Sequence, residues 1–513
     1  MAQIILIQPL TGSWDEMSIR MPESLLAVAS VPVAKGYDVQ IIDQRCSRDF
    51  NSDIDAAVCE NTIIFGITAI TGEQIRHALE VTRLVKRRHP TVPVCWGGVH
   101  ATLLPEQTIA HPMIDFVVVG DGENVFCELF ERLRDGLCLD GLHGLLYKKD
   151  GEILSSAGRL EVKQNIKGGR YSVSRKDGMA DVITDMDCLP PLPYHLLNMD
   201  NYSVFDTDDG TRSATLNTSR GCPHCCTFCV DPIINEGIWR GFSAERVLEK
   251  VNLLYDTYQV RMIYFQDDYF PGSKQRLLNI LKGLEVYARK LLWGTLGIRA
   301  DSLAALNNEE LDLLYRSGCH SLEIGIETGS TRILNMLNKG ETLDVMRSTN
   351  MRLARYAIKV KYTLIIGFPG ETKSEVLETL NFAEELERVN PNAYCLIFNF
   401  LPIVNTPFFN EAVSNGFGAP KNLSDWEHMN FDTWMKHYQN WASPSMVAWL
   451  QAISFVSYFH NRNVRYKFSG SLLLHIAFIC YQPVAAWRFR HRLFGWFIEM
   501  KVKNWIFAIK KLL

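Results

Sequence analysis

The sequence predicts an α/β protein of 513 residues with an N-terminal doubly wound, Rossmann-like domain, a partial (β/α)6 barrel and a mostly helical C-terminal region. Three observations support this prediction. Short apolar runs alternate with helix-like segments from residue 4 to about 136, which is typical of a parallel sheet covered on both faces. Six strand and helix units then follow between about 216 and 408, and right-handed crossovers curl such units around one axis. Beyond 409 the pattern is mainly helical.

The first domain is expected over residues 1–140. Its strands are predicted at 4–10, 38–44, 62–70, 92–98 and 115–123, with helices at 23–36 and 73–89. A doubly wound sheet binds its ligand beyond the carboxyl ends of the strands. The candidate ligand-binding residues at that edge are Gly97, Gly98, His100, Gly120, Asp121 and Gly122.

A hairpin and a linker are expected over residues 141–210. The hairpin turns at Asp150 and Gly151, and the proline-bearing stretch 187–197 is typical of a linker. The barrel is predicted over 211–408 and the helical region over 409–513. The expected barrel strands lie near 216 and at 261–268, 293–299, 321–328, 360–368 and 393–401.

Bulk composition excludes some classes of protein. The chain is 47% hydrophobic and 21% charged with a net charge of -4, which argues against disorder and against a surface that coats nucleic acid.

The first apolar run has no basic leader and only strand length, so no secretory signal is expected. A cytoplasmic location and reduced thiols are predicted for the 13 cysteines, and clustered cysteines then suggest a metal.

The last fifty residues differ in charge from the rest. Residues 462–513 hold ten Lys or Arg and one Glu. One helical face is predicted in the tail, formed by Phe494, Ile498, Val502, Trp505, Ile509 and Leu512. This tail is expected either to lie on the inner face of a membrane or to pack on the barrel with a solvated basic face. The uncharged stretch 469–487 contains His, Gln and Pro, which argues against a membrane span.

Four cysteines crowd the stretch "SRGCPHCCTFC" at 219–229. As two CxxC knuckles they would bind zinc, but structural zinc sites usually separate their knuckles by a longer loop. As C-x3-C-x2-C, the three residues Cys222, Cys226 and Cys229 could wrap a cubane iron-sulfur cluster and leave one iron without a protein ligand. Cys225 falls outside this spacing, and its role stays open.

The cysteine loop, with "FQDDYF", "LEIGIETGS" and "IIGFPGET" at later strand ends, resembles the radical SAM superfamily over residues 216–407. The resemblance implies a 4Fe-4S cluster that binds and reductively cleaves S-adenosyl-L-methionine, giving a radical that removes hydrogen from an unactivated carbon. The implied S-adenosylmethionine contacts are Asp267, Asp268, Arg299, Glu323, Glu327, Gly367 and Pro369. The alternatives are a paired structural carboxylate at Glu323 or Glu327, a structural ion pair at Arg299, and a turn without a ligand at Gly367 and Pro369.

The segments "PESLLAVASVPVAKGYDVQIID", "FGITAIT", "WGGVHATLLPEQ" and "VVVGDGE" resemble the cobalamin-binding class of radical SAM enzymes over residues 4–136. The resemblance implies cobalamin bound at the glycine-rich edge of the sheet. Because the D-x-H-x-x-G element is absent, no lower histidine ligand is expected. His100 is predicted to serve the fold or the corrin rim, and the alternative for the domain is an empty nucleotide-like scaffold.

The layout and "HATLLPEQ" resemble the branch with the anaerobic magnesium-protoporphyrin monomethyl ester cyclase and hopanoid-processing enzymes. The prediction is therefore a C-methyltransferase acting on a hydrophobic or bulky small molecule, such as a lipid or tetrapyrrole. A reductant such as flavodoxin or ferredoxin is the expected protein partner, and no nucleic acid is expected. The alternatives are an oxidative cyclase without net methylation and a non-catalytic iron-sulfur and cobalamin sensor.

Overall fold

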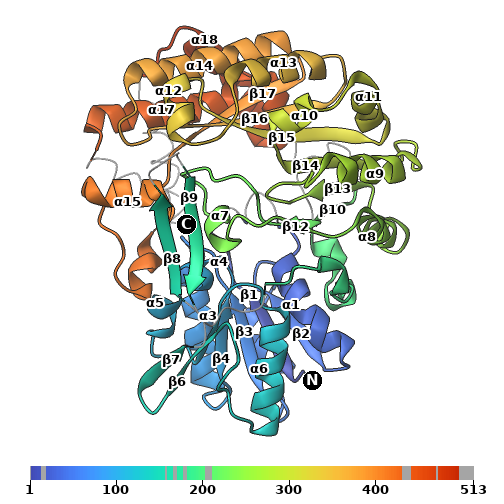
Figure 1. The fold of residues 1–513 in the computed structure, drawn as a ribbon, viewed down its shortest axis with the longest axis vertical. Coiled ribbons are helices and arrows are strands. Elements are labelled where there is room, and N and C mark those ends of the chain that lie inside the picture. The colour runs from blue at the N-terminus through green and yellow to red at the C-terminus, as the bar shows by residue number, and fades with distance from the viewer. Residues whose placement is uncertain are drawn as a thin grey trace.

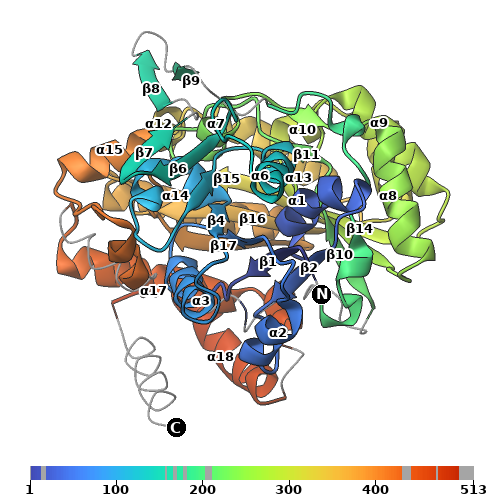
Figure 2. The same cartoon turned by 90° about the horizontal axis from the view of Figure 1, so that it is seen from below.

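The computed structural model of the chain has two α/β parts, each built on its own sheet (Figure 1). It describes residues 2–12, 15, 19–155, 159–165, 170–176, 182–202, 211–429, 441–468 and 472–495. The first sheet carries the N-terminal domain, and the second carries the barrel and supports the C-terminal helices (Figures 1 and 2).

The N-terminal sheet has seven strands in the order β2-β1-β3-β4-β5-β6-β7. Its parallel strands are β1 (Ile4–Gln8), β2 (Val39–Asp43), β3 (Ile64–Thr68), β4 (Val94–Gly97) and β5 (Phe116–Val118). All five predicted strands are present. The hairpin β6 (Leu145–Lys149) and β7 (Glu152–Ser155) adds to this sheet antiparallel to β5, so the sheet runs past the predicted boundary at 140. The hairpin turns where predicted, with positive φ at Asp150 and Gly151.

Helices cover both faces of this sheet, which makes the domain doubly wound. The side chains of Ile4 and Leu6 belong to one apolar cluster with α1 (Glu23–Ala34) and α6 (Glu123–Asp135). The alternating residues Ile5 and Ile7 belong to a second cluster with α2 (Phe50–Ala57) and α3 (Gln74–Arg88). Because successive side chains of a strand point to opposite faces, both faces of β1 are buried.

The barrel sheet is fully parallel, in the order β10-β13-β14-β15-β16-β17. Its strands are β10 (Ser213–Leu216), β13 (Met262–Phe265), β14 (Leu292–Ile298), β15 (Cys319–Glu327), β16 (Lys359–Ile366) and β17 (Ala393–Asn399). The main crossover helices are α8 (Ala244–Asp256), α9 (Lys274–Glu285), α11 (Asn308–Arg316), α13 (Leu343–Leu353) and α14 (Lys373–Val389). The sequential strand order confirms the predicted partial (β/α)6 barrel.

The region between the sheets has structure that the sequence did not predict. A separate hairpin, β8 (Arg159–Asn165) with β9 (Arg170–Lys176), lies within the predicted linker.

After the barrel, α15 (Pro407–Ser414) and the 3-10 helix η5 (Leu423–His428) return to the first domain, where Trp426 joins the cluster of α3. Arg83 of α3 also pairs with Glu427 at 2.7 Å. The start of the helical region therefore packs on the N-terminal domain.

The end of the described chain forms two stacked helices. Helix α17 (Pro444–His460) packs against β17, and α18 (Leu472–Arg490) packs on α17 (Figure 2). None of the helices in the described ranges combines the length and apolar character of a transmembrane segment. The predicted amphipathic face starting at Phe494 lies almost entirely beyond residue 495, outside the described residues.

Candidate functional site

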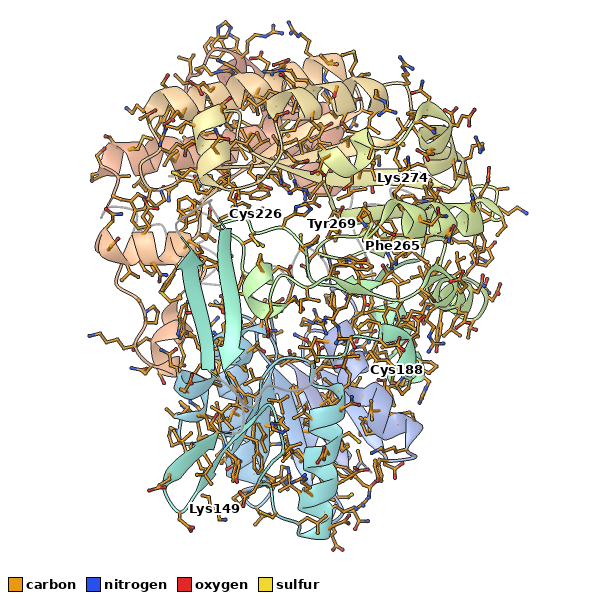
Figure 3. The ribbon with its side chains drawn as sticks, viewed as in Figure 1. Lys149, Cys188, Cys226, Phe265, Tyr269 and Lys274 are labelled. Atoms are coloured by element: carbon orange, nitrogen blue, oxygen red, sulfur yellow. The ribbon has the colours of Figure 1, made fainter. Side chains whose placement is uncertain are left out.

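The cysteine loop connects the first barrel strand to α8 and is anchored by a two-stranded ribbon. Its strands are β11 (Ser219–Arg220) and β12 (Arg240–Gly241), and the short helix α7 (Asp231–Ile234) follows the last cysteine. Gly221 has a φ of 84°, and a Cβ there would lie 2.1 Å from the Ile238 carbonyl oxygen. Only glycine therefore allows the chain to turn from the ribbon into the loop. Figure 3 places Cys226 in this loop, between the two sheets.

Burial works against ionisation of the predicted cluster cysteines. Burial is the largest influence on all three thiols: it raises the pKa of Cys222 to about 12 and holds the pKa values of Cys226 and Cys229 above their ordinary value. The backbone N–H of Asp231 donates to Cys229 Sγ at 3.4 Å. Three desolvated thiolates need compensating positive charge, which bound iron supplies. The donor chemistry therefore fits the predicted cluster.

The zinc alternative requires several ligand atoms around one point. Across the described part of the chain, no group of three or more His, Cys, Asp or Glu side chains converges closely enough to hold a single metal ion. Cys225 packs against the apolar cluster that contains α2 and α3 residues and Ile233 of α7, and its carbonyl oxygen accepts from Asn338 Nδ2 at 2.9 Å. The side chain of this fourth cysteine therefore makes an apolar contact.

The two aspartates after β13 have different environments. Asp267 is buried, and its Oδ1 accepts from Thr218 N at 2.9 Å, from Thr218 Oγ1 at 2.8 Å and from Ser219 Oγ. Burial raises the pKa of Asp267 to about 6 despite these hydrogen bonds. Asp268 instead lines the cavity between the domains. Asp267 thus supports the entry to the cysteine loop, and Asp268 has the more accessible carboxylate.

A buried ion network lies behind the loop at the ends of β14 and β15. Arg299 Nη2 lies 2.8 Å from Asp301 Oδ2 and 3.6 Å from Glu341 Oε2, which is the structural ion pair weighed as its alternative. Lys339, which no sequence motif indicated, lies 3.1 Å from Glu327 and 3.4 Å from Glu341. Its positive charge acts on Cys226 to lower that thiol's pKa, against the larger effect of burial. The network therefore places two cations, together with three carboxylates, beside the cysteine loop.

The other predicted contacts on the strands divide into paired and turn residues. Glu323, in the middle of β15, pairs with Lys361 on β16 at 2.7 Å, the structural alternative for this carboxylate. Glu327 ends the strand with a φ of 66°. Gly367 and Pro369 form the turn after β16, where Glu371 accepts from the backbone N–H of Gly367 at 2.5 Å. Burial raises the pKa of Glu371 to about 7.

A cavity of about 360 Å³ joins the two domains. One wall is the glycine-rich edge of the first sheet and includes Gly97, Gly98, Gly120, Asp121 and Gly122. The opposite wall includes Asn217, Ser219, Arg220 and Asp268 from the barrel and its cysteine loop. A Cβ on Gly97 would have only the Val118 carbonyl oxygen within 4 Å, at 4.0 Å. The glycine leaves space that a bound group can fill.

His100 differs from its predicted neighbours because it does not line this cavity. Its ring is fully buried, with Nδ1 3.1 Å from Thr71 Oγ1, and packs edge-on against Trp426 at 5.4 Å. Burial lowers the pKa of His100 to about 3, so the ring is neutral. His100 therefore contacts the surrounding fold, and its role at the corrin rim stays a prediction.

Asp121 is held by arginines across the domain interface. Arg220 Nη1 lies 2.9 Å from Asp121 Oδ1 and also contacts Glu123, while Arg240 contacts the other oxygen of Asp121. Glu123 and Arg240 are nearly inaccessible to solvent. We call these four residues the interdomain ion cluster. They connect the segment after β5 to the ribbon that anchors the cysteine loop. Sequence spacing could not show this link, because Arg220 and Asp121 lie 99 residues apart.

Comparison with known proteins agrees with this two-domain site. Residues 216–383 match the radical SAM superfamily, and residues 22–130 match the B12 binding domain. An uncharacterized methyltransferase from Pyrococcus horikoshii, PH0819, is 32% identical over 389 residues, which cover 75% of this chain and 78% of that protein. This chain belongs to the B12-binding radical SAM enzymes.

Two relatives of this radical SAM enzyme have stated activities. The cytidylyl-2-hydroxyethylphosphonate methyltransferase of Streptomyces wedmorensis is 26% identical over 78% of this chain and 79% of that protein. The anaerobic magnesium-protoporphyrin IX monomethyl ester cyclase of Rubrivivax gelatinosus is 23% identical over 83% of this chain and 70% of that protein.

A solved structure has the same fold. The radical S-adenosylmethionine methyltransferase TsrM from Kitasatospora setae, with cobalamin and a 4Fe-4S cluster bound, matches with a TM-score of 0.65 at 14% identity, covering 93% of this chain and 99% of that one. The radical SAM and B12-binding domains together imply a 4Fe-4S cluster, S-adenosylmethionine and cobalamin as cofactors of this chain. The buried thiols and the glycine-lined cavity fit these groups.

Proposed function

We propose that this radical SAM enzyme methylates a carbon atom of a hydrophobic or bulky small molecule in the space between the barrel and the B12-binding domain. The observation that carries the proposal is the shared cavity. Its walls combine the glycine edge of the first sheet with residues next to the cysteine loop. The predicted cobalamin edge and Asp268, a predicted S-adenosylmethionine contact, therefore border one volume, which supports a reaction that uses both cofactors.

Residue roles follow from this arrangement. Cys222, Cys226 and Cys229 would hold the cluster, and Asp268 would accept from the S-adenosylmethionine ammonium. The neutral turn at Gly367 and Pro369 would allow close approach of the adenine. Gly97, Gly98, Gly120 and Gly122 would form the cobalamin wall, while Asp121 would act through the interdomain ion cluster. When bound, the cofactors supply a carbon-centred radical and a transferable methyl group.

The supporting network has an electrostatic role in this proposal. Arg299 and Lys339 are buried cations near the thiols, and each is paired with carboxylates. They would offset part of the negative charge of the thiolate-bound cluster. Glu323 and Glu327 would then act as structural carboxylates that hold Lys361 and Lys339 and leave the cofactor ammonium to Asp268.

Oxidation or cyclisation without net methylation is the second candidate, because relatives include the magnesium-protoporphyrin cyclase. That relationship also supports a tetrapyrrole-like substrate. We also propose a flavodoxin or ferredoxin as the reductant, and peripheral membrane contact through the basic C-terminal tail. The purely sensory alternative is disfavoured by the family to which the chain belongs.

Anaerobic reconstitution with iron, sulfide and cobalamin tests the proposal. With reductant, S-adenosylmethionine and candidate tetrapyrroles or lipids, mass spectrometry should detect a product heavier by one methyl group. S-adenosylhomocysteine and 5′-deoxyadenosine should accumulate together, because a second S-adenosylmethionine regenerates methylcobalamin. Product formation with 5′-deoxyadenosine but without S-adenosylhomocysteine would instead establish the oxidative candidate.

A further inference from the structure

The outer face of α18 is apolar where a helix on a protein surface is usually polar. The exposed side chains from one end of this face to the other are Ile476, Ala477, Ile479, Cys480, Pro483, Val484 and Trp487. The four large ones are about half exposed: Ile476 49%, Ile479 46%, Val484 47% and Trp487 51%. At 1.5 Å per residue this stripe is ~17 Å long. We call these seven residues the α18 stripe.

The opposite face of α18 packs on α17. The stripe is therefore a second apolar face of the same helix. Phe478, Ala485 and Phe489 are buried, and the ring of Phe489 stacks on His460 of α17 at 4.0 Å. Gln482 Nε2 donates to the His460 carbonyl oxygen at 2.8 Å. Helix α18 is thus fixed on α17 by one apolar face and presents a second one outward. A helix that is apolar all round is normally buried on both sides.

Cations lie at both ends of the stripe. At its start, Arg465 is exposed and donates to His475 Nε2 at 2.9 Å, and Arg462 is exposed beside it. At its end, the side chain of Arg490 is 77% exposed and lies 4.0 Å from Glu384 of α14. The sequence from 462 onward holds ten basic residues and one acidic residue. The exposed arginines at the two ends of the stripe therefore favour an anionic partner.

We propose that the α18 stripe is a docking surface for the headgroup and upper acyl region of an anionic lipid bilayer. An apolar helical face with arginines at its ends and a tryptophan on it matches the interface of such a membrane. A second copy of the chain would bring two strongly basic regions together, which electrostatic repulsion disfavours. The surface deepens the membrane contact proposed for the tail and does not depend on the chemistry of methyl transfer.

Flotation of the full-length holoprotein with lipid vesicles tests this docking surface. The probes are vesicles of phosphatidylcholine alone and of phosphatidylcholine with 30% phosphatidylglycerol, at about 0.1 M and 0.5 M salt, which changes the Debye length from ~10 Å to ~4 Å. The wild type should bind the anionic vesicles at low salt. The variant Ile476→Glu/Val484→Glu should bind them at least about tenfold more weakly, because each substitution removes apolar contact and adds repulsion.

The matched control is Val286→Glu/Met351→Glu, which replaces two apolar residues that are 78% and 60% exposed on the barrel surface. It should bind vesicles like the wild type. Cobalamin absorbance and iron content, unchanged in both variants, show that the fold is intact. A third variant, Lys501→Glu/Lys503→Glu, separates the tail from α18.

Three results would overturn the proposal. The wild type could fail to bind either kind of vesicle. The stripe variant could bind like the wild type while only the tail variant loses binding. Light scattering could also show a dimer that the stripe variant converts to a monomer, with no vesicle binding, so that a second copy is the occupant. None of these results depends on whether methyl transfer is observed.

Discussion

At the scale of residues, the site depends on side chains whose neighbours decide their chemistry. The three predicted cluster cysteines are desolvated thiols, whereas Cys225 of the same loop packs against an apolar cluster. Likewise, Gly97 and Gly98 are adjacent but meet different surroundings. Gly98 has a φ of 92° and a Cβ there would lie 2.8 Å from Thr68 Oγ1, whereas the Gly97 position is open.

Removing any one of Cys222, Cys226 and Cys229 should abolish the cluster. Replacement by alanine should lower both bound iron and 5′-deoxyadenosine formation at least about tenfold, because thiolate ligation provides the binding free energy of the cluster. Cys225→Ala is the control and should keep iron and its absorbance near wild type. Iron assay and visible spectroscopy of anaerobically prepared protein check this. Iron retained by a Cys226→Ala variant and lost by Cys225→Ala would reverse the ligand assignment.

The two glycines should separate binding from folding. Gly97→Val should lower cobalamin affinity at least about tenfold with little change in the unfolding temperature, because its side chain would occupy cavity space. Gly98→Ala should lower the unfolding temperature, because alanine at positive φ is strained and its Cβ would also lie 2.9 Å from the Ala69 carbonyl oxygen. Cobalamin titration by absorbance and thermal unfolding of the apoprotein measure the two effects. Equal loss of stability in both variants would contradict the open environment of Gly97.

At the scale of elements, α17 is attached to the barrel through a buried histidine. His460 Nδ1 lies 2.6 Å from the Ser457 carbonyl oxygen, and Nε2 lies 2.8 Å from Glu387 of α14. Both nitrogens face acceptors, so the protonated ring satisfies both. Burial lowers the pKa of His460. The charge and hydrogen bond of Glu387 act in the opposite direction, as do the Ser457 carbonyl and the charge of Glu384. Together they outweigh burial, so the pKa of His460 is raised.

The raised pKa of His460 gives a pH dependence with a definite sign. Its stabilising contribution is complete below the unfolded pKa of 6.5 and is lost as pH rises through the higher folded value. The unfolding temperature of the wild type should therefore fall above pH 6.5, and Glu387→Gln should reduce this fall. Removing one partner of a buried pair costs roughly 3–5 kcal/mol, so the variant should also be less stable at pH 6.

Glu385→Gln is the control for this element, because Glu385 lies on the same helix but pairs with Arg347 at a partly exposed position. It should leave the pH profile unchanged. Thermal unfolding of the apoprotein from pH 6 to 9 gives the comparison. Identical profiles for the Glu387 and Glu385 variants would show that His460 does not carry the dependence.

At the scale of the whole molecule, the interdomain ion cluster links the B12-binding domain to the ribbon that anchors the cysteine loop. Arg220 precedes Cys222 by two residues and contacts two carboxylates on the cobalamin side of the interface. The burial of Glu123 and Arg240 makes these ion pairs sensitive to loss of either partner.

Asp121→Asn should weaken the docking of the domains. Leaving Arg240 without its buried counterion costs roughly 3–5 kcal/mol. We expect faster proteolysis between the domains and at least about tenfold weaker cobalamin retention. Arg316→Ala breaks an exposed pair with Glu285 and should change neither, because such pairs contribute about 0–1 kcal/mol. Normal cobalamin retention in Asp121→Asn would exclude a coupling role for the cluster.

The predicted elements agree with the structure where the signal is local. All five strands of the first sheet and the six barrel strands came from apolar runs, because a strand buried on both faces must be apolar throughout. The hairpin turn at Asp150 and Gly151 was predictable from that dipeptide alone. The sheet partner of that hairpin and the return of Trp426 to the first domain depend on distant contacts and were not predictable from periodicity. The additional β8 and β9 pair is a local hairpin that the prediction of a linker missed.

The sequence by itself determined the chemistry, because three cysteines at fixed spacing and the strand-end motifs are contiguous signals read along one chain. Only the tertiary structure decided which aspartate supports the loop and which lines the cavity, that Arg220 and Arg240 hold Asp121, and that α18 turns an apolar face outward. These depend on pairs separated by tens to hundreds of residues and on burial. Burial is set by the packing of whole elements and leaves no mark at a single position.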